Sequence, residues 1–179
     1  MATVAILHIV HYDDMHNEAV NNSIVDADIV HETCHKVAHG IKDYEFCVAA
    51  LEEDPRSHSA DLQGLGIISM ELIIENATKI GSRIKGLLND QKYGRDAKRL
   101  LQACEDLYSM AKDVTKQAID HFKSKDYHGA SSLVDSAQVA ATTCEDGFKG
   151  AGLKSPLIAE DNYIIQLTSI VVTITKIVH

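Results

Sequence analysis

The sequence predicts an all-α protein, and three observations support this prediction. Apolar residues recur every three or four positions over long stretches, which is the spacing of a buried helix face. The 179-residue chain has only two prolines and 5% aromatic residues, so helix breakers and strand-forming side chains are both scarce. Its length fits one domain with a sizeable core. We expect an up-down-up-down four-helix bundle that carries an N-terminal helical hairpin.

The first 26 residues are expected to lie outside this domain. Their short apolar run lacks a preceding basic region and is interrupted by His8, so it resembles at most a truncated signal peptide. We interpret residues 1–26 as a flexible leader or signal remnant, and residues 27–179 as the folded domain.

The predicted hairpin occupies residues 27–54. Its first helix, from Ala27 to His39, is expected to end at Gly40 as a C-cap, and its second helix runs from Asp43 to Glu53. Two cysteines flank the turn, so a disulfide between Cys34 and Cys47 could staple the hairpin.

The remaining residues, 59–179, are predicted to form the four bundle helices. Asp54-Pro55 ends the hairpin, and Ser57, Ser59 and Asp61 are all capable N-caps for the next helix. The helices are expected at about 59–89, 97–122, 127–148 and 160–178. The β-branched residues of the last segment leave a strand as an alternative, but its three-four spacing favours a helix.

The second bundle helix has the most regular apolar pattern in the chain. Its expected buried residues are Ala97, Leu100, Cys104, Leu107, Ala111, Val114, Ala118 and Phe122. Because Cys104 and Cys144 both fall on apolar stripes, a bridge between the second and third bundle helices is geometrically natural.

Charge and cysteine content restrict the classes of partner. The formal net charge of -9 argues against nucleic acid or an anionic membrane, and no apolar run is long enough to span a bilayer. Ten histidines would bring the net charge toward zero in an acidic compartment. Four cysteines permit three pairings, match no common zinc spacing and, if oxidised, imply a secretory route.

Several short motifs, taken together, resemble the plant invertase and pectin methylesterase inhibitor family. They are YEFC (Tyr44 to Cys47), DPRSHSADLQGL (Asp54 to Leu65), Cys104 followed by Tyr108, KSKDY (Lys123 to Tyr127), CEDGF (Cys144 to Phe148) and Ser155-Pro156. The resemblance implies a bundle with a hairpin and the disulfides Cys34–Cys47 and Cys104–Cys144. It also implies a secreted, apoplastic inhibitor, not an enzyme, that binds a plant pectin methylesterase or acid invertase 1:1 by occluding its active-site cleft.

The resemblance also indicates where such a protein would touch its target. Members that inhibit acid invertase place a Pro-Lys-Phe tripeptide in the loop before the fifth helix, where this sequence has Tyr127-His128-Gly129. Members that inhibit pectin methylesterase bind across the cleft with faces of the bundle helices. We therefore take Lys125, Asp126, Tyr127 and His128 as candidate target contacts.

Other polar groups have ordinary explanations. His31, His35 and His39 recur every four residues, but such stripes are usually solvated, and we predict no metal site and no cofactor. Paired carboxylates such as Glu52-Glu53 and Glu160-Asp161 lie at predicted helix ends, where charge is ordinarily solvated or capping.

Two sequons and one alternative function remain from the sequence. Asn21 and Asn76 each begin a glycosylation sequon. Catalytic serine, phosphate-loop and nucleotide motifs are missing, which argues against an enzyme. The alternative to inhibition is a non-inhibitory pollen or seed bundle protein and allergen that binds, at most, a small ligand.

Overall fold

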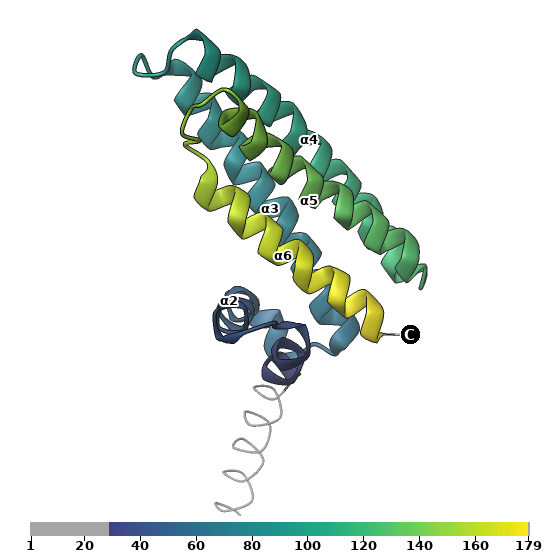
Figure 1. Cartoon of the computed structure of the whole chain (residues 1–179). Helices are drawn as coiled ribbons and strands as arrows, with labels where there is room; N and C mark the ends of the chain where they lie inside the picture. The colour runs from purple at the N-terminus through teal and green to yellow at the C-terminus, as the bar shows by residue number, and fades with distance from the viewer. Residues whose placement is uncertain (1–28, 179) are drawn as a thin grey trace, which may run out of the picture.

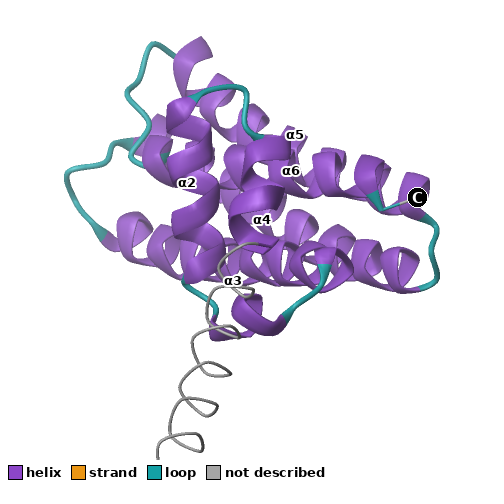
Figure 2. Ribbon diagram, turned by 90° about the horizontal axis from the view of Figure 1, so that it is seen from below, coloured by secondary structure: helices purple, strands orange, loops and turns teal. Residues whose placement is uncertain are grey.

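A computed structural model of the chain describes residues 29–178, and within this range the fold is helical without strands (Figure 2). Four long helices form a bundle in which each packs against two neighbours, in the order α3, α4, α5, α6 and back to α3 (Figure 1). Their bounds are α3 (Leu62–Asn89), α4 (Arg95–Lys123), α5 (Tyr127–Gly150) and α6 (Ile158–Ile177). The predicted all-α bundle is confirmed, and the β-branched last segment is a helix.

An N-terminal hairpin lies beside one end of the bundle (Figure 1). It consists of the helical residues 29–37 and α2 (Ile41–Glu52), joined by the predicted Cys34–Cys47 disulfide. Phe46 of α2 meets Tyr163 of α6 edge to face, with ring centroids 5.0 Å apart. Residues 1–26, the predicted leader with its sequon at Asn21, lie outside the described residues.

The role predicted for Gly40 is wrong. A C-cap glycine adopts the left-handed conformation, whereas Gly40 is fully extended, with φ -177° and ψ 176°. It is the N-cap of α2, whose first turn begins two residues earlier than expected, at Ile41, and Tyr44 N–H donates to the Gly40 carbonyl. The turn has the expected three residues but lies two positions earlier, at residues 38–40.

Two aspartates shape the connection from the hairpin to the bundle. Asp54 accepts a hydrogen bond from Arg56 N–H and begins a 3-10 turn, η1 (Pro55–Ser59). Of the three predicted N-caps for α3, the structure uses Asp61, whose Oδ1 accepts from Gly64 N–H at 2.7 Å. This cap satisfies a backbone donor that the first turn of α3 would otherwise leave free.

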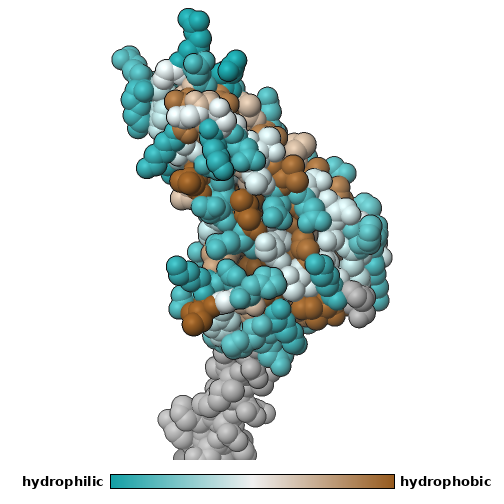
Figure 3. Space-filling model, viewed as in Figure 1, coloured by the Kyte–Doolittle hydropathy of each residue, from teal (hydrophilic) through white to brown (hydrophobic). Residues whose placement is uncertain are grey.

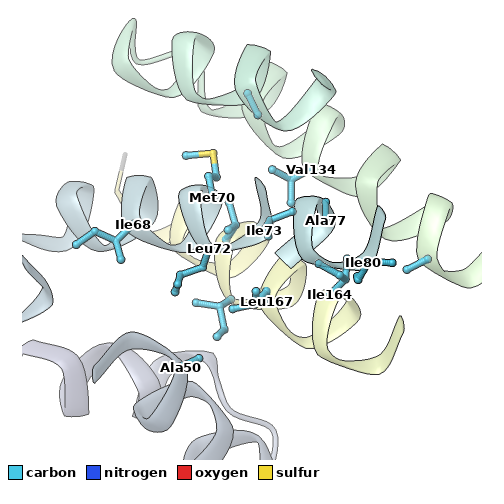
Figure 4. Close-up of a cluster of buried hydrophobic side chains, with 14 of the residues drawn as sticks. Ala50, Ile68, Met70, Leu72, Ile73, Ala77, Ile80, Val134, Ile164 and Leu167 are labelled. Carbon is cyan, nitrogen blue, oxygen red and sulfur yellow. The ribbon is translucent and has the colours of Figure 1, made fainter. Parts of the chain in front are cut away.

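The core runs along the bundle and is built mainly from aliphatic side chains. In Figure 4, α3 residues such as Ile73 and Ile80 meet Val134 of α5 and Ile164 and Leu167 of α6. The predicted Cys104–Cys144 disulfide joins α4 to α5, and both of its cysteines are buried. Closing loops of 13 and 40 residues stabilises the fold by about 3 and 4 kcal/mol in the chain-entropy model.

The buried face of α4 differs from the predicted stripe. Cys104, Ala111, Ala118 and Phe122 are buried as expected, but the other four predicted residues are only half-buried. The face is wider because α4 packs against both α3 and α5, and it also includes Leu101, Tyr108, Thr115 and Ile119. Hydrophobic spacing skips Tyr108 and Thr115 because they are polar.

On the face seen in Figure 3, hydrophobic residues form separate patches between charged and polar ones. Among residues 29–178, no helix is both long and apolar enough to cross a bilayer.

Candidate functional site

The candidate contact residues lie at the corner where α4 turns into α5. Lys125 N–H donates to the Phe122 carbonyl at 3.0 Å, and Asp126 N–H donates to the His121 carbonyl at 2.9 Å. This pair of bonds is the Schellman arrangement, which places one residue in the left-handed conformation. That residue is usually glycine, but here it is Lys125, with φ 65°. The corner therefore holds a non-glycine residue in a strained conformation.

Asp126 locks the start of α5. Its Oδ1 accepts from Gly129 N–H at 2.9 Å, and its Oδ2 lies 2.6 Å from His121 Nδ1. The Gly129 N–H and then the His121 ring hold the pKa of Asp126 below its usual value. A Cβ on Gly129 would lie 2.6 Å from His121 Nδ1 and closer still to Asp126 Oδ2, so this arrangement requires glycine.

Tyr127 anchors the corner to the rest of the bundle. Its half-buried ring packs edge to face on Phe122 at 5.1 Å, and its hydroxyl accepts a hydrogen bond from Gln63 Nε2 at 3.0 Å. Phe122 is buried against Gly66 of α3, where any Cβ would lie 2.7 Å from the phenyl Cζ. The corner is therefore tied to the first turns of α3.

The four candidate residues thus divide into two groups. Asp126 and Tyr127 hold the corner in place by the contacts described above. Lys125 and His128 are exposed, as is Asp126. With Ser131 and Lys176, they line a shallow surface pocket of about 440 Å³. Lys176, at the end of α6, adds a second lysine that sequence spacing did not connect to this site.

One prediction about this region needs correction. Tyr127-His128-Gly129 does not lie in the loop, because α5 begins at Tyr127 and these residues form its first turn. The connecting residues are 124–126. A three-residue connection leaves little room for the chain to move independently of the two helices.

Two of the three hairpin histidines contact the side chain of Tyr44. His31 Nδ1 lies 2.6 Å from the Tyr44 hydroxyl, and the His35 ring stacks on Tyr44 at 4.4 Å. Within residues 29–178, no group of three or more His, Cys, Asp or Glu side chains is arranged to hold a metal ion.

The sequon at Asn76 lies in the middle of α3. Asn76 is half-buried beside α6, and its Nδ2 donates to the Leu72 carbonyl at 2.8 Å. Glycosylation there stays a prediction.

Comparison with known proteins decides the family. Residues 28–174 match the family described as plant invertase/pectin methylesterase inhibitor. The chain belongs to this family. Its members are inhibitors of enzymes, so this inhibitor acts on a protein partner and is not itself an enzyme.

Some relatives are named as inhibitors of invertase or fructosidase, and others as inhibitors of pectinesterase. A "Putative invertase inhibitor" of Platanus orientalis is 45% identical over 157 residues, covering 86% of this chain and 92% of the relative. The "Pectinesterase inhibitor" of Actinidia deliciosa is 32% identical over 150 residues, covering 83% and 78%. The "Cell wall / vacuolar inhibitor of fructosidase 2" of Arabidopsis thaliana is 33% identical over 130 residues, covering 72% and 70%.

Solved structures support the fold. A pectin methylesterase inhibitor from Arabidopsis thaliana superposes with a TM-score of 0.62 at 22% identity, covering 84% of this chain and 95% of the other. A mutant form of an Arabidopsis pectin methylesterase inhibitor gives a TM-score of 0.66 at 23% identity, covering 75% and 89%. At these identities the match concerns the fold alone.

Proposed function

We propose that this inhibitor blocks a plant acid invertase by inserting the α4–α5 corner into the substrate cleft. The observation that carries the proposal is the exposed basic tip, Lys125 with His128 and Lys176, on a chain whose net charge is -9. Among the described residues that line the pocket at this tip, Asp126 is the only carboxylate, and it is already engaged by Gly129 and His121. Glycoside hydrolases carry a pair of carboxyl groups at the scissile bond, so their clefts favour a cationic tip.

The rigidity of the corner supports the same proposal. A loop that must order on binding reduces affinity, because each immobilised side chain and backbone unit loses entropy. Here the Schellman bonds, the Asp126 cap and the Tyr127 contacts already fix the backbone around Lys125. Binding would then restrict little beyond the exposed lysine and histidine side chains.

The relatives add support for the target and the compartment. The Platanus orientalis and Arabidopsis thaliana relatives are named for inhibition of invertase and of fructosidase, and the latter is named as acting in the cell wall or vacuole. The proposal therefore includes secretion to the apoplast, where the two disulfides would persist, and a 1:1 complex with one enzyme molecule.

Pectin methylesterase is the second candidate target, and one surface favours it. Residues 129–144 of α5 contain a single charged side chain, Asp135, and expose mainly serine and threonine, with Val139 among them. Interface centres are depleted of charge, so this helix face could lie across a broad cleft. The acidic surface of the inhibitor would also attract a basic esterase.

A paired inhibition assay distinguishes the two targets. The oxidised full chain is titrated at pH 5–6 against a plant acid invertase and a plant pectin methylesterase. A charge reversal at the tip, Lys125→Glu, is compared with Lys154→Glu, an exposed lysine in the α5–α6 connection.

The proposal predicts inhibition of invertase that weakens at least about tenfold in Lys125→Glu and is unchanged in Lys154→Glu. Inhibition of the esterase alone would overturn the proposal and name the second candidate. Inhibition of neither enzyme would favour the non-inhibitory bundle protein.

A further inference from the structure

A polar cluster with a buried centre lies within the bundle, away from the α4–α5 corner. Its centre is Tyr108 of α4 and Asp161 of α6; the half-buried Glu145 of α5 and Glu160 of α6 and the exposed Arg83 of α3 lie around it. Asp161 and Tyr108 are each only 1% exposed. A buried carboxyl group needs partners for both of its oxygens, because water cannot solvate it there.

Asp161 has an ordinary partner on one side only. The Tyr108 hydroxyl donates to Asp161 Oδ1, while Asp161 Oδ2 is buried with no conventional donor. Glu145 Oε2 and Glu160 Oε2 are in the same condition, and the Glu145 and Asp161 carboxyl groups are within hydrogen-bonding reach of each other. Two ionised carboxylates are both acceptors only, so such a contact requires a proton.

No cation in the cluster replaces that proton. Arg83 faces the group from α3, but its guanidinium is paired with Glu160 Oε1 and donates to the Pro156 carbonyl at 3.1 Å. Glu160 adds a further negative charge near Asp161. A proton on Asp161 would let its carboxyl group donate to Glu145 and would satisfy the contact between the two groups.

We propose that a single proton, held by Asp161 and donated in a hydrogen bond to Glu145, joins α5 to α6 in acidic surroundings and is lost as the pH rises. Because the pair lies inside the bundle, the inference does not depend on which enzyme is bound. The bond is the carboxylic acid O–H of Asp161 donating to a carboxylate oxygen of Glu145. Loss of the proton leaves two negative charges in contact in a poorly solvated site.

The direction of the pKa shift of Asp161 agrees with the proposal. Burial, with the nearby Glu145 and Glu160 charges, raises the pKa of Asp161 to about 7, although the Tyr108 hydrogen bond opposes this rise. A carboxyl with a raised pKa in the folded state stabilises the fold fully below its unfolded pKa, near 3.8. This contribution is lost as the pH rises through about 7.

The test is a series of thermal melts of the oxidised full chain from pH 4.5 to pH 8, with no target present. Asp161→Asn keeps an acceptor for Tyr108 and supplies a permanent N–H donor toward Glu145. Glu145→Gln supplies a donor from the opposite side. Asp146→Asn, an exposed carboxyl beside Glu145, is the matched control.

The wild type and the control are expected to lose about 3–5 °C of Tm per pH unit between pH 5 and pH 7, relative to Asp161→Asn or Glu145→Gln. Equal pH slopes in the wild type and in whichever of these two variants folds would overturn the proposal. Infrared spectroscopy of the wild type at pH 5 gives a direct second reading. A protonated carboxyl band that disappears by pH 8 is expected, and absence of that band at pH 5 would contradict a proton on Asp161.

Discussion

The α4–α5 corner and the α5–α6 corner use the same backbone motif but fill it differently. At the end of α5, Gly152 N–H donates to the Lys149 carbonyl at 3.0 Å, and Leu153 N–H donates to the Phe148 carbonyl at 2.9 Å. These bonds match those at Lys125, and the left-handed residues have φ 67° and 65° respectively. Gly152 adopts this conformation without strain, whereas Lys125 pays about 1 kcal/mol for it.

The two corners also differ in how closely other side chains surround them. The α4–α5 corner is braced by the His121–Asp126 contact, and Tyr127 bonds to Gln63. A Cβ on Gly152 would meet nothing within 4 Å, so the second corner is open. Strained, well-braced backbone is typical of sites where a side chain must be presented in a fixed position. The comparison therefore supports the α4–α5 corner as the contact site.

Among substitutions at the two corners, the largest change in unfolding free energy is expected from Gly129→Ala. The added methyl group would collide with Asp126 and His121, so the variant should lose about 2 kcal/mol of unfolding free energy. Gly150→Ala is the control from the other corner, where a Cβ meets nothing within 4 Å, and it should gain up to about 1 kcal/mol. Urea denaturation measures both, and equal responses would show that the His121–Asp126 arrangement does not restrict position 129.

The next effect comes from exchanging the left-handed residues. Lys125→Gly should stabilise the protein by about 1 kcal/mol because it relieves the strain, and Gly152→Ala should destabilise it by about 1 kcal/mol because it introduces the same strain. The two changes in unfolding free energy are predicted to have opposite signs. A destabilised Lys125→Gly variant would mean that the lysine side chain contributes more to the fold than its backbone costs.

A smaller effect is expected from Tyr127→Phe. This change keeps the ring on Phe122 but removes the hydroxyl that accepts from Gln63, so about 0.5 kcal/mol should be lost. A double-mutant cycle with Gln63→Ala isolates the hydrogen bond. Additive losses in that cycle would show that the bond does not brace the corner.

The smallest effect concerns acid pH. Because the pKa of Asp126 is lowered in the folded state, its contribution is present above the ordinary value of 3.8 and is lost as the pH falls through the folded value. Asp126→Asn, which retains a capping oxygen, should show a weaker loss of Tm below pH 4 than the wild type. Carboxyl NMR titration gives the pKa directly, and an unshifted Asp126 would contradict the observed cap.

The sequence predicted the bundle well because apolar residues recur at helical spacing along each bundle helix. Long apolar stripes located the helices, and cysteine positions on those stripes agreed with the Cys104–Cys144 bridge. The stripe on α4 missed Tyr108 and Thr115 because they are buried polar residues. Each is satisfied by a specific hydrogen bond, to Asp161 and to the Ala111 carbonyl, that hydrophobic spacing does not reveal. The stripe also missed Leu101 and Ile119 because α4 packs against two helices and buries a wider face.

The candidate site was predicted only as a position along the chain. Four neighbouring residues were chosen together, but geometry separates Asp126 and Tyr127 from the exposed Lys125 and His128. The supporting residues His121 and Gly129 were missed because their roles depend on how the chain turns at the corner. Gly40 was assigned to the wrong helix end, because a glycine in a turn does not reveal its φ angle.

The most direct test of a functional α4–α5 corner is to measure stability and invertase inhibition on the same Lys125→Gly protein. The account predicts a variant that is about 1 kcal/mol more stable yet inhibits acid invertase at least about tenfold less tightly, because strain is relieved and the exposed cation is lost. Greater stability with undiminished inhibition would contradict the account, since the strained lysine would then have no part in binding the enzyme.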